Sequence, residues 1–274
     1  MVAKFQNRIQ RYGWNKAAPI YDELWGRQLA PAHELLIEMA APRAGERVLD
    51  VACGTGVITF RAAEAVASGG TVVGVDISDE MVKRCRAEAR RRGIGRIGFE
   101  RAKADGLDYP DGTFTSVLCS LGLMYVPDPG VALREFLRVL RPGGQTVVAV
   151  WGARKNCGWA GIFPAVDARV RSEVCPLFFQ LGTGGALRMA LETAGFEEVE
   201  VRRICTALRY DSAREAVAAA FAAGPVALAY SRFDDLARMQ AHAEYLASIE
   251  PYRRGGGYDL PGEFVLARGV KPFR

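Results

Sequence analysis

Short apolar runs alternate with longer amphipathic segments through the first half of the chain. Runs of strand length cover residues 47–51, 71–75, 97–101, 114–120 and 145–151. Segments of helical character lie between several of them, at 57–67, 79–92 and 130–140. Continuous apolar strands that alternate with helices are typical of a parallel sheet covered on both faces. We therefore predict an α/β fold with a doubly wound, mostly parallel sheet.

The pattern differs at the two ends of the chain. Residues 5–41 are expected to form helices that are interrupted at Pro19 and Pro31. Beyond residue 151 the sequence predicts three helices, two strands and a loop: helices at 184–194, 213–223 and 233–249, a long strand at 196–210, a loop at 253–257 and a last strand at 264–270. Aromatic residues are frequent at 152–180, so this segment is not expected to be a solvated loop.

The first two predicted strands each end near an acid, and the first opens into the glycine turn 52–56. Such a turn lets the backbone approach a ligand, and the acid after the second strand, Asp76, can accept both ribose hydroxyls. A dinucleotide fingerprint needs Gly or Ala at position 59, but Thr59 stands there, so a close approach of helix and strand is not expected. Asp50 would repel a pyrophosphate and suit an amino group. A ligand with a ribose, no phosphates and a cationic amino acid end is S-adenosylmethionine.

Residues 45–151 resemble a class I S-adenosylmethionine-dependent methyltransferase, in particular the ubiquinone/menaquinone-biosynthesis methyltransferases and their small-molecule relatives. The resemblance rests on LDVACGTG at 49–56, on VVGVDIS at 72–78 with Met81 shortly after, and on LREFLRVLRPGGQTVVAVW at 133–151. It implies a Rossmann-like, seven-stranded sheet whose last two strands form a reversed hairpin at the edge. It also implies a helical cap on the sheet. The chain then divides into an N-terminal lid (1–41), a cofactor-binding core (42–151) and the rest of the sheet (152–274), and the cap is inserted in this last part at about 211–262.

The resemblance also implies which residues bind S-adenosylmethionine and its product S-adenosylhomocysteine. Asp50, Ala52, Gly54 and Gly56 would surround the methionine end, as would Cys119 and Ser120 at the end of the fourth strand. Asp76 would bind the ribose, Ile77 and Met81 the adenine face, and Tyr21 would close over the cofactor from the lid.

The adenine edge departs from the family pattern. Lys103 stands where relatives carry an aspartate that accepts a hydrogen bond from the adenine amino group, and a lysine only donates. The backbone of Ala104 or the carboxylate of Asp105 could replace that contact. A weakened cofactor site leaves open a non-catalytic or regulatory protein of the same fold. An NAD(P)-dependent oxidoreductase is a further alternative, against which Thr59 and the edge hairpin argue.

Methyl transfer from a sulfonium mainly requires alignment and exclusion of water, and a general base only if the acceptor must lose a proton. The candidates for a catalytic role are Tyr125, Tyr21, His242 and His33. Tyr125 follows the fourth strand, where it would lie over the reacting centre. Together with Trp159 and Phe163, the two tyrosines are expected to form walls of an apolar acceptor pocket in the cap.

Nucleic acid is disfavoured as the acceptor. Enzymes that methylate exocyclic base amines carry a polar residue and Pro-Pro-aromatic after the fourth strand, whereas residues 120–125 read SLGLMY. A cytosine C5 enzyme needs Pro-Cys, and the pair Cys175-Pro176 has the reverse order. The aromatic cap instead favours a small apolar or aromatic acceptor. Whether oxygen, nitrogen or carbon accepts the methyl group is left open.

Composition changes this picture little. The 274 residues carry a net charge of +5, and much of the excess lies on 83–96, which we interpret as a solvated helix face. Six scattered cysteines and two histidines form no metal-binding motif, so no metal is predicted and the thiols are expected to be reduced. Neither a signal peptide nor a membrane-spanning run is recognisable, and we expect a cytoplasmic protein. The oligomeric state is not predicted.

Overall fold

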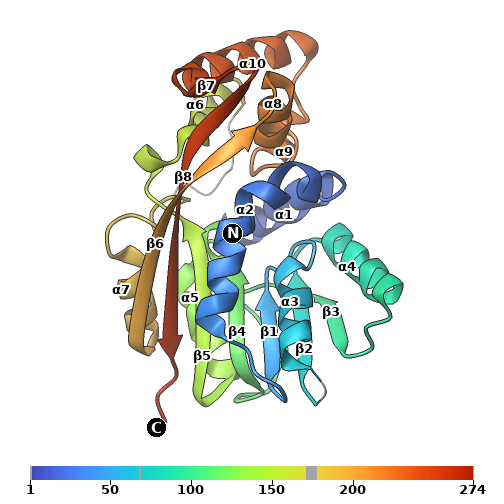
Figure 1. Ribbon diagram of the computed structural model, residues 1–274, viewed down its shortest axis with the longest axis vertical. Coiled ribbons are helices and arrows are strands. Elements are labelled where there is room, and N and C mark those ends of the chain that lie inside the picture. The colour runs from blue at the N-terminus through green and yellow to red at the C-terminus, as the bar shows by residue number, and fades with distance from the viewer. Residues whose placement is uncertain (1, 68, 171–177, 274) are drawn as a thin grey trace.

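The computed structural model describes residues 2–67, 69–170 and 178–273, and within them one mixed sheet of eight strands forms the centre of the molecule (Figure 1). The strand order is β3-β2-β1-β4-β5-β8-β6, and β7 pairs with β8. The strands are β1 (Arg47–Val51), β2 (Thr71–Asp76), β3 (Ile97–Arg101), β4 (Phe114–Ser120), β5 (Leu140–Trp151), β6 (Glu197–Tyr210), β7 (Arg253–Arg254) and β8 (Gly257–Val270). The first five are parallel, and β8 runs antiparallel between β5 and β6. The predicted doubly wound fold with a reversed edge hairpin is confirmed, with the two-residue β7 in addition.

Helices cover both faces of the sheet. Those around the sheet are α1 (Val2–Ala17), α2 (Tyr21–Ala40), α3 (Val57–Val66), α4 (Asp79–Arg92), α5 (Pro129–Val139) and α7 (Ala186–Ala194). Because the strand order reverses at β1, right-handed crossovers put α3 and α4 on one face and α5 on the other. Helix α2 packs against α3, β4 and β5, and α5 packs against α7. Helices α1 and α4 contact each other, and both border the carboxyl ends of the parallel strands, where this fold binds ligands.

Helix α4 has the bounds that its sequence predicts. The Ser78 hydroxyl caps its first turn by accepting from the Met81 N–H at 3.2 Å, and Gly93 ends it with φ 65. Asp79 lies in the first turn and Arg90 in the last, where each charge complements the helix dipole. The end of β2 and the start of α4 are thereby held in a fixed relation, and Asp76 lies between them.

Three predicted boundaries are wrong. Strand β5 begins at Leu140 rather than at residue 145. Helix α2 continues through Pro31. The proline costs one helical hydrogen bond, but burial of the neighbouring Leu29 and Ala32 side chains in the core outweighs that cost. The last strand begins at Gly257 rather than at residue 264, and part of the predicted loop at 253–257 forms β7. Pairing with β6 as far as Tyr210, which lies opposite Tyr258, extends β8 beyond the apolar run that the sequence displays.

The extended ends of β6 and β8 form a two-stranded ribbon that carries the cap beyond the sheet (Figure 1). The cap helices are α6 (Ile162–Asp167), α8 (Ala213–Phe221), α9 (Ala227–Tyr230) and α10 (Asp235–Ile249). Helix α1 packs against α9, and α2 packs against α8, so the N-terminal helices join the cap to the sheet. In the part of the chain that the structure describes, no helix combines the length and the apolar character needed to cross a membrane.

Candidate functional site

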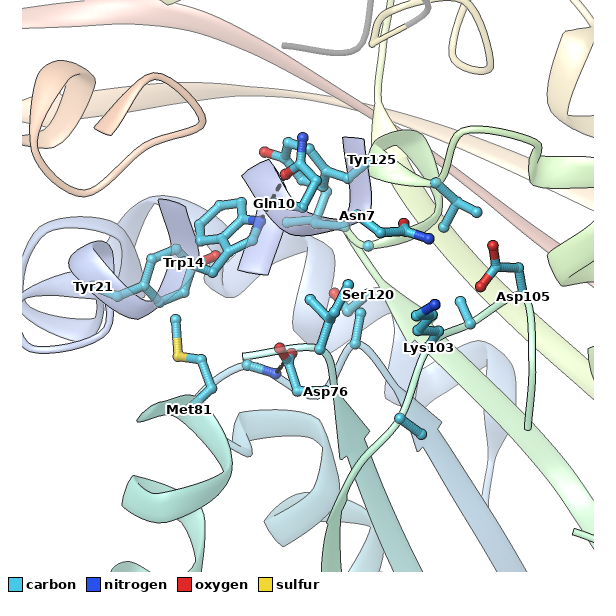
Figure 2. A pocket seen from close by; sticks show the side chains of 18 residues that line it. Asn7, Gln10, Trp14, Tyr21, Asp76, Met81, Lys103, Asp105, Ser120 and Tyr125 are labelled. Carbon is cyan, nitrogen blue, oxygen red and sulfur yellow. Dashed lines mark hydrogen bonds between the residues drawn. The ribbon is translucent and has the colours of Figure 1, made fainter. Parts of the chain in front are cut away.

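A cavity of about 750 Å³, including the space at its mouth, opens at the carboxyl ends of the parallel strands (Figure 2). Most residues predicted to bind a cofactor line it: Tyr21, Ala52, Gly54, Asp76, Ile77, Met81, Lys103, Ala104, Asp105 and Ser120. Tyr125, predicted to contact the acceptor, lines it as well. Five predicted residues do not line it: Asp50, Gly56, Cys119, His33 and His242.

Asp76 is the most firmly held polar group of this cavity. Its Oδ1 accepts from the Ser78 backbone N–H at 2.8 Å, and its Oδ2 accepts from the Gly54 N–H at 2.9 Å. Burial raises the pKa of Asp76, and the hydrogen bonds from backbone N–H groups oppose that rise. The carboxyl group is thus fixed in one orientation, and each oxygen keeps a lone pair for a ligand hydroxyl.

The turn after β1 brings the backbone close to the cavity. Ala52 and Gly54, in this turn, and Leu121, just after β4, line it with φ values of 57, 54 and 57. These values lie in the left-handed region, which disfavours residues other than glycine. The Ser120 hydroxyl, at the end of β4, is buried and has no hydrogen-bond partner within residues 2–67, 69–170 and 178–273. A buried hydroxyl without a partner calls for an explanation, and Ser120 lines the cavity.

Asp50 lies behind the turn rather than in the cavity. Its Oδ2 accepts from the Thr59 hydroxyl at 2.6 Å, and burial is the main cause that raises its pKa to about 7. Helix α3 does approach β2 closely at this point: a Cβ on Gly74 would lie 2.9 Å from the Thr59 Oγ1. The expectation drawn from Thr59 was therefore wrong, because the glycine that allows the approach is on the strand and not on the helix.

Gly56 and Cys119 also lie outside the cavity lining. Gly56 begins α3 with φ 89, and a Cβ there would lie 2.9 Å from the Phe60 ring and 3.1 Å from the Cys85 sulfur. Glycine is therefore required both by the backbone and by packing. Cys119 is fully buried, and burial raises the pKa of its thiol to about 12, so it is neutral and unreactive.

Neither histidine lines the cavity. His242 is on α10, where its Nε2 lies 3.0 Å from the Tyr230 hydroxyl, and burial lowers its pKa. His33 is buried in α2, and burial, with a smaller effect of Arg61, lowers its pKa to about 4.

Helix α1 contributes three cavity residues that the sequence analysis missed, Asn7, Gln10 and Trp14. The Trp14 Nε1–H donates to the Gln10 Oε1 at 3.1 Å, and Figure 2 shows both side chains over the cavity. Their spacing of three and four residues puts them on one helix face, which is the signal that could have found them. The helix is fixed to the start of α4 by Arg11 Nε, 2.6 Å from Asp79 Oδ2.

A smaller space of about 310 Å³, including the open space at its mouth, adjoins this cavity and is lined largely by aromatic side chains. Both are lined by Trp14, Tyr21, Leu121 and Tyr125, and the further wall of the smaller space comes from Trp25, Leu29, Met124, Trp151, Trp159 and 223–225. The rings of Trp14 and Tyr125 meet edge to face at 5.1 Å. We call this second space the aromatic chamber. Phe163, predicted as a wall, packs behind Trp159 at 5.6 Å instead of lining the chamber.

Tyr21 and Tyr125 stand between the cavity and the aromatic chamber. Burial is the largest cause that raises the pKa of each phenol, so both are protonated at neutral pH. A protonated phenol donates a hydrogen bond and is a poor general base. As for metals, residues 2–67, 69–170 and 178–273 contain no group of three or more His, Cys, Asp or Glu suited to hold an ion, and Cys175 lies outside the described residues.

The doubly wound sheet, the glycine turn and the anchored acid after β2 define an α/β protein of the Rossmann-like class. The model of the ubiE/COQ5 methyltransferase family matches residues 30–157. The chain is 34% identical over 221 residues to nocamycin O-methyltransferase of Saccharothrix syringae, which covers 74% of this chain and 78% of that protein. It belongs to the ubiE/COQ5 methyltransferase family, and it is an S-adenosylmethionine-dependent methyltransferase.

Other relatives share the core or the fold. The ubiquinone/menaquinone biosynthesis C-methyltransferase of Cronobacter sakazakii is 42% identical over 113 residues, which are 41% of this chain and 45% of that enzyme, so the match spans less than half of it. Haemonchus contortus phosphoethanolamine N-methyltransferase 2, solved with phosphomonomethylethanolamine and S-adenosylhomocysteine, has a TM-score of 0.62 at 16% identity, over 99% of this chain and 60% of that one. The [4+2]-cyclase SpnF has the same TM-score at 21% identity, over 97% of this chain and 96% of its own. Because this fold also occurs in a cyclase, methyl transfer rests on family membership and not on the fold.

Proposed function

We propose that the 750 Å³ cavity is the S-adenosylmethionine site and that the enzyme methylates a small apolar or aromatic acceptor in the aromatic chamber. The observation that carries the proposal is the adjacency of the two spaces, one with an anchored carboxylate and one lined largely by aromatic side chains. The two spaces share the walls formed by Trp14, Tyr21 and Tyr125. When bound, S-adenosylmethionine supplies an activated methyl group, and the chain has only to align the acceptor and exclude water.

Asp76 is proposed to accept hydrogen bonds from the two ribose hydroxyls. Its two oxygens each accept one backbone N–H already, which orients the carboxyl group without using all of its lone pairs. Ile77 and Met81 then form the adenine wall, and the Ser120 hydroxyl faces the methionine end. Lys103, Ala104 and Asp105 would border the adenine edge, as expected from the sequence.

Asp50, Gly56 and Cys119 are proposed to support the site from behind rather than to contact the cofactor. The bond between Asp50 and the Thr59 hydroxyl ties the end of β1 to α3, and Gly56 lets α3 begin directly after the turn. For His242, the contact with the Tyr230 hydroxyl supports a structural role in the cap. Residues 1–41 and the cap insertion are proposed to act as covers of one site rather than as separate domains.

Tyr21 and Tyr125 are proposed to orient the acceptor as hydrogen-bond donors. Among the described residues that line the aromatic chamber there is no histidine, aspartate or glutamate, and the raised pKa values of both phenols disfavour proton abstraction. The acceptor is therefore expected to lose its proton, if it has one to lose, to water rather than to a side chain.

A small molecule fits this site better than a nucleic acid does. The aromatic chamber is small, and aromatic rings form much of its wall. The basic face of α4 is partly neutralised by its own acids, since Glu88 pairs with both Arg91 and Arg92. These pairs support the interpretation of that face as a solvated surface.

The proposed cofactor site is tested by titration calorimetry with S-adenosylhomocysteine. We expect Asp76→Asn to weaken binding by about 1.5–3 kcal/mol, because hydrogen bonds from the ribose to a charged group are lost. The exposed acid Asp108, which does not line the cavity, gives the matched control Asp108→Asn. Equal affinities of the two variants, with unchanged circular dichroism, would remove Asp76 from the site. NAD serves as a second ligand, for which no binding is expected.

A further inference from the structure

The free edge of the sheet carries a groove that belongs neither to the 750 Å³ cavity nor to the aromatic chamber. Strand β3 stands at one end of the strand order, and helix α4 packs beside it (Figure 1). Two adjoining hollows of about 640 and about 840 Å³, including their open space, lie along this helix and strand, and Arg86 and Arg90 line both. We call this space the edge groove. One half of it is charged and the other half is largely apolar.

The charged half of the edge groove contains more cations than acids. Its charged lining consists of Asp79, Lys83, Arg86, Arg90 and Arg101. Asp79 is the one acid in this described lining, and two arginines share it: Arg11 at 2.6 Å and Arg101 at 3.3 Å. Arg90 is exposed and forms no ion pair with any residue of 2–67, 69–170 or 178–273. The groove therefore keeps a positive charge that can attract carboxylates.

The opposite face of α4 does not have this excess. There Arg91 and Arg92 both pair with Glu88, at 2.7 and 2.6 Å. Helical spacing separates the two faces, because positions 79, 83, 86 and 90 line the edge groove whereas 84, 88 and 91 line a hollow beside α3. In the groove, the exposed Lys83 lies 3.5 Å from Glu80, a surface pair of little strength. A solvated, self-neutralised surface thus describes the Glu88 face and not the edge groove.

The other half of the edge groove has an apolar floor. Ala89 and Phe99 are buried there, and Ile94 and Ile97 are half-buried. Apolar side chains beside a row of cations make the groove itself amphipathic. Its complement is a segment with apolar residues on one face and carboxylates next to them.

The backbone of β3 shows that this segment is not an added strand. The Arg96 carbonyl accepts from the Val72 N–H at 3.3 Å and the Ala102 N–H donates to the Asp76 carbonyl at 3.1 Å, so the even-numbered residues pair with β2. The backbone groups of Phe99 consequently face outward. Arg86 occupies the Phe99 carbonyl with two bonds, from Nε at 3.0 Å and from Nη2 at 2.7 Å. A strand edge that is closed by a guanidinium group leaves side chains as the means of contact, and these are what a helix presents.

We propose that the edge groove binds an acidic amphipathic helix of a partner protein. Its apolar side chains cover Ile94 and Ile97, and its carboxylates meet Lys83, Arg90 and Arg101. A nucleic acid would use the cations but leave the apolar half uncovered, so a helix fits the groove better. Because Asp79 also accepts from Arg11 on α1, the bound helix lies beside the helix that covers the cavity. This inference does not depend on the proposed function.

The inference is tested by fluorescence anisotropy with a synthetic peptide of about five helical turns, which carries leucines on one face and glutamates on the others. We expect it to bind the full-length protein at about 0.15 M salt. A peptide of the same composition in scrambled order, and a single-stranded RNA of similar net charge, should both bind at least about tenfold more weakly.

Two double variants locate the binding surface. Lys83→Glu/Arg90→Glu should weaken binding of the amphipathic peptide about tenfold or more, because carboxylates would then face carboxylates. The matched control Arg84→Glu/Arg91→Glu makes the same change of charge on the opposite face of α4 and should leave the affinity nearly unchanged. Both variants should bind S-adenosylhomocysteine as the wild type does. In the wild type, the peptide should slow amide hydrogen exchange in residues 79–101, a measurement that needs no variant.

Four results would overturn the inference. Equal losses in the two double variants would mean that the peptide responds to overall charge and not to the groove. Equal affinity for the scrambled peptide, or no binding of the amphipathic one, would exclude a docked helix. Tighter binding of the RNA would assign the groove to nucleic acid. Unchanged exchange in residues 79–101 would place the peptide elsewhere. None of these results bears on the proposed cofactor site, which the titration of Asp76→Asn tests separately.

Discussion

Ala52 and Gly122 face each other at the floor of the cofactor cavity, and each limits the other. Ala52 has φ 57, a conformation that costs a non-glycine residue roughly 1–2 kcal/mol. A Cβ on Gly122 would lie 2.3 Å from the Cβ of Ala52. There is therefore room for only one methyl group between these two positions. It belongs to Ala52, whose backbone is in the less favourable conformation.

Gly122→Ala should consequently lower the free energy of unfolding by about 1–3 kcal/mol, the usual cost of overpacking. Gly122 has φ −103, so the backbone itself accepts an alanine. In the exchanged pair Ala52→Gly/Gly122→Ala the single methyl group has moved across, and most of the lost stability should return. Thermal and urea unfolding of both single variants and of the pair measure this coupling. Additive losses in the double variant would contradict it.

Buried ionisable groups make the stability depend on pH. Asp50 keeps its proton in the folded state up to about pH 7, whereas in the unfolded chain it loses the proton near its ordinary value of 3.8. Between these values the folded state holds more protons, so this group lowers the free energy of unfolding as the pH rises from about 4 to about 7. We expect Asp50→Asn to be increasingly more stable than the wild type across this range, as measured by urea unfolding. A difference that does not change with pH would contradict this assignment.

His33 changes the free energy of unfolding with pH in the opposite direction, which is why Asp50→Asn has to be compared with the wild type. Its pKa is lowered to about 4 from 6.5, so the unfolded chain takes up the proton first and stability is lost as the pH falls through this interval. The two effects overlap in the wild type and partly cancel. Subtracting the wild-type curve from that of Asp50→Asn removes the contribution of His33.

At the scale of elements, the parallel half of the sheet follows from the sequence almost residue by residue. The strands β1, β3 and β4 have their predicted bounds, because turn residues lie close to each of them. Strand β5 is the exception, since it begins at Leu140 and not at residue 145. The extension of β8 was not predictable, since its first half is paired with β6 and not marked by an apolar run. The same reason applies to the site. Asp76 and Gly54 belong to a local motif, whereas Asn7, Gln10 and Trp14 enter by tertiary packing from a helix without one.

Helix α1 is expected to respond to the cofactor, because it covers the cavity and few polar contacts fix it. Asn15 Oδ1 accepts from the Ser78 hydroxyl at 2.6 Å, beside the ion pair of Arg11 and Asp79. Amide hydrogen exchange of residues 6–17 should slow when S-adenosylhomocysteine binds. Asn15→Ala should speed exchange in this helix, both with and without ligand, and leave β4 unchanged. Exchange of α1 that is indifferent to the ligand would contradict its role as a lid.

At the scale of the whole molecule, sheet and cap share one core. The cluster of buried side chains runs from Val48 and Leu118 in the sheet to Phe221 and Tyr245 in the cap without interruption. This continuity supports treating the cap as part of a single folding unit, although most of its helices lie in an insertion. It also explains how the aromatic chamber draws its walls from distant segments, since Trp25, Trp159 and Pro225 all meet there.

The chain leaves the sheet for the cap at Tyr210 and returns at Tyr258, two residues that lie opposite each other in the ribbon. An insertion whose ends are adjacent can change in length and sequence without altering the path of the strands on either side. Recombination at this pair would thus replace the part of the aromatic chamber's wall formed by 223–225 and leave the parallel strands unchanged. If the proposed function holds, the choice of acceptor can change by exchange of the segment between Tyr210 and Tyr258, while the use of the methyl donor is kept by the glycine turn after β1.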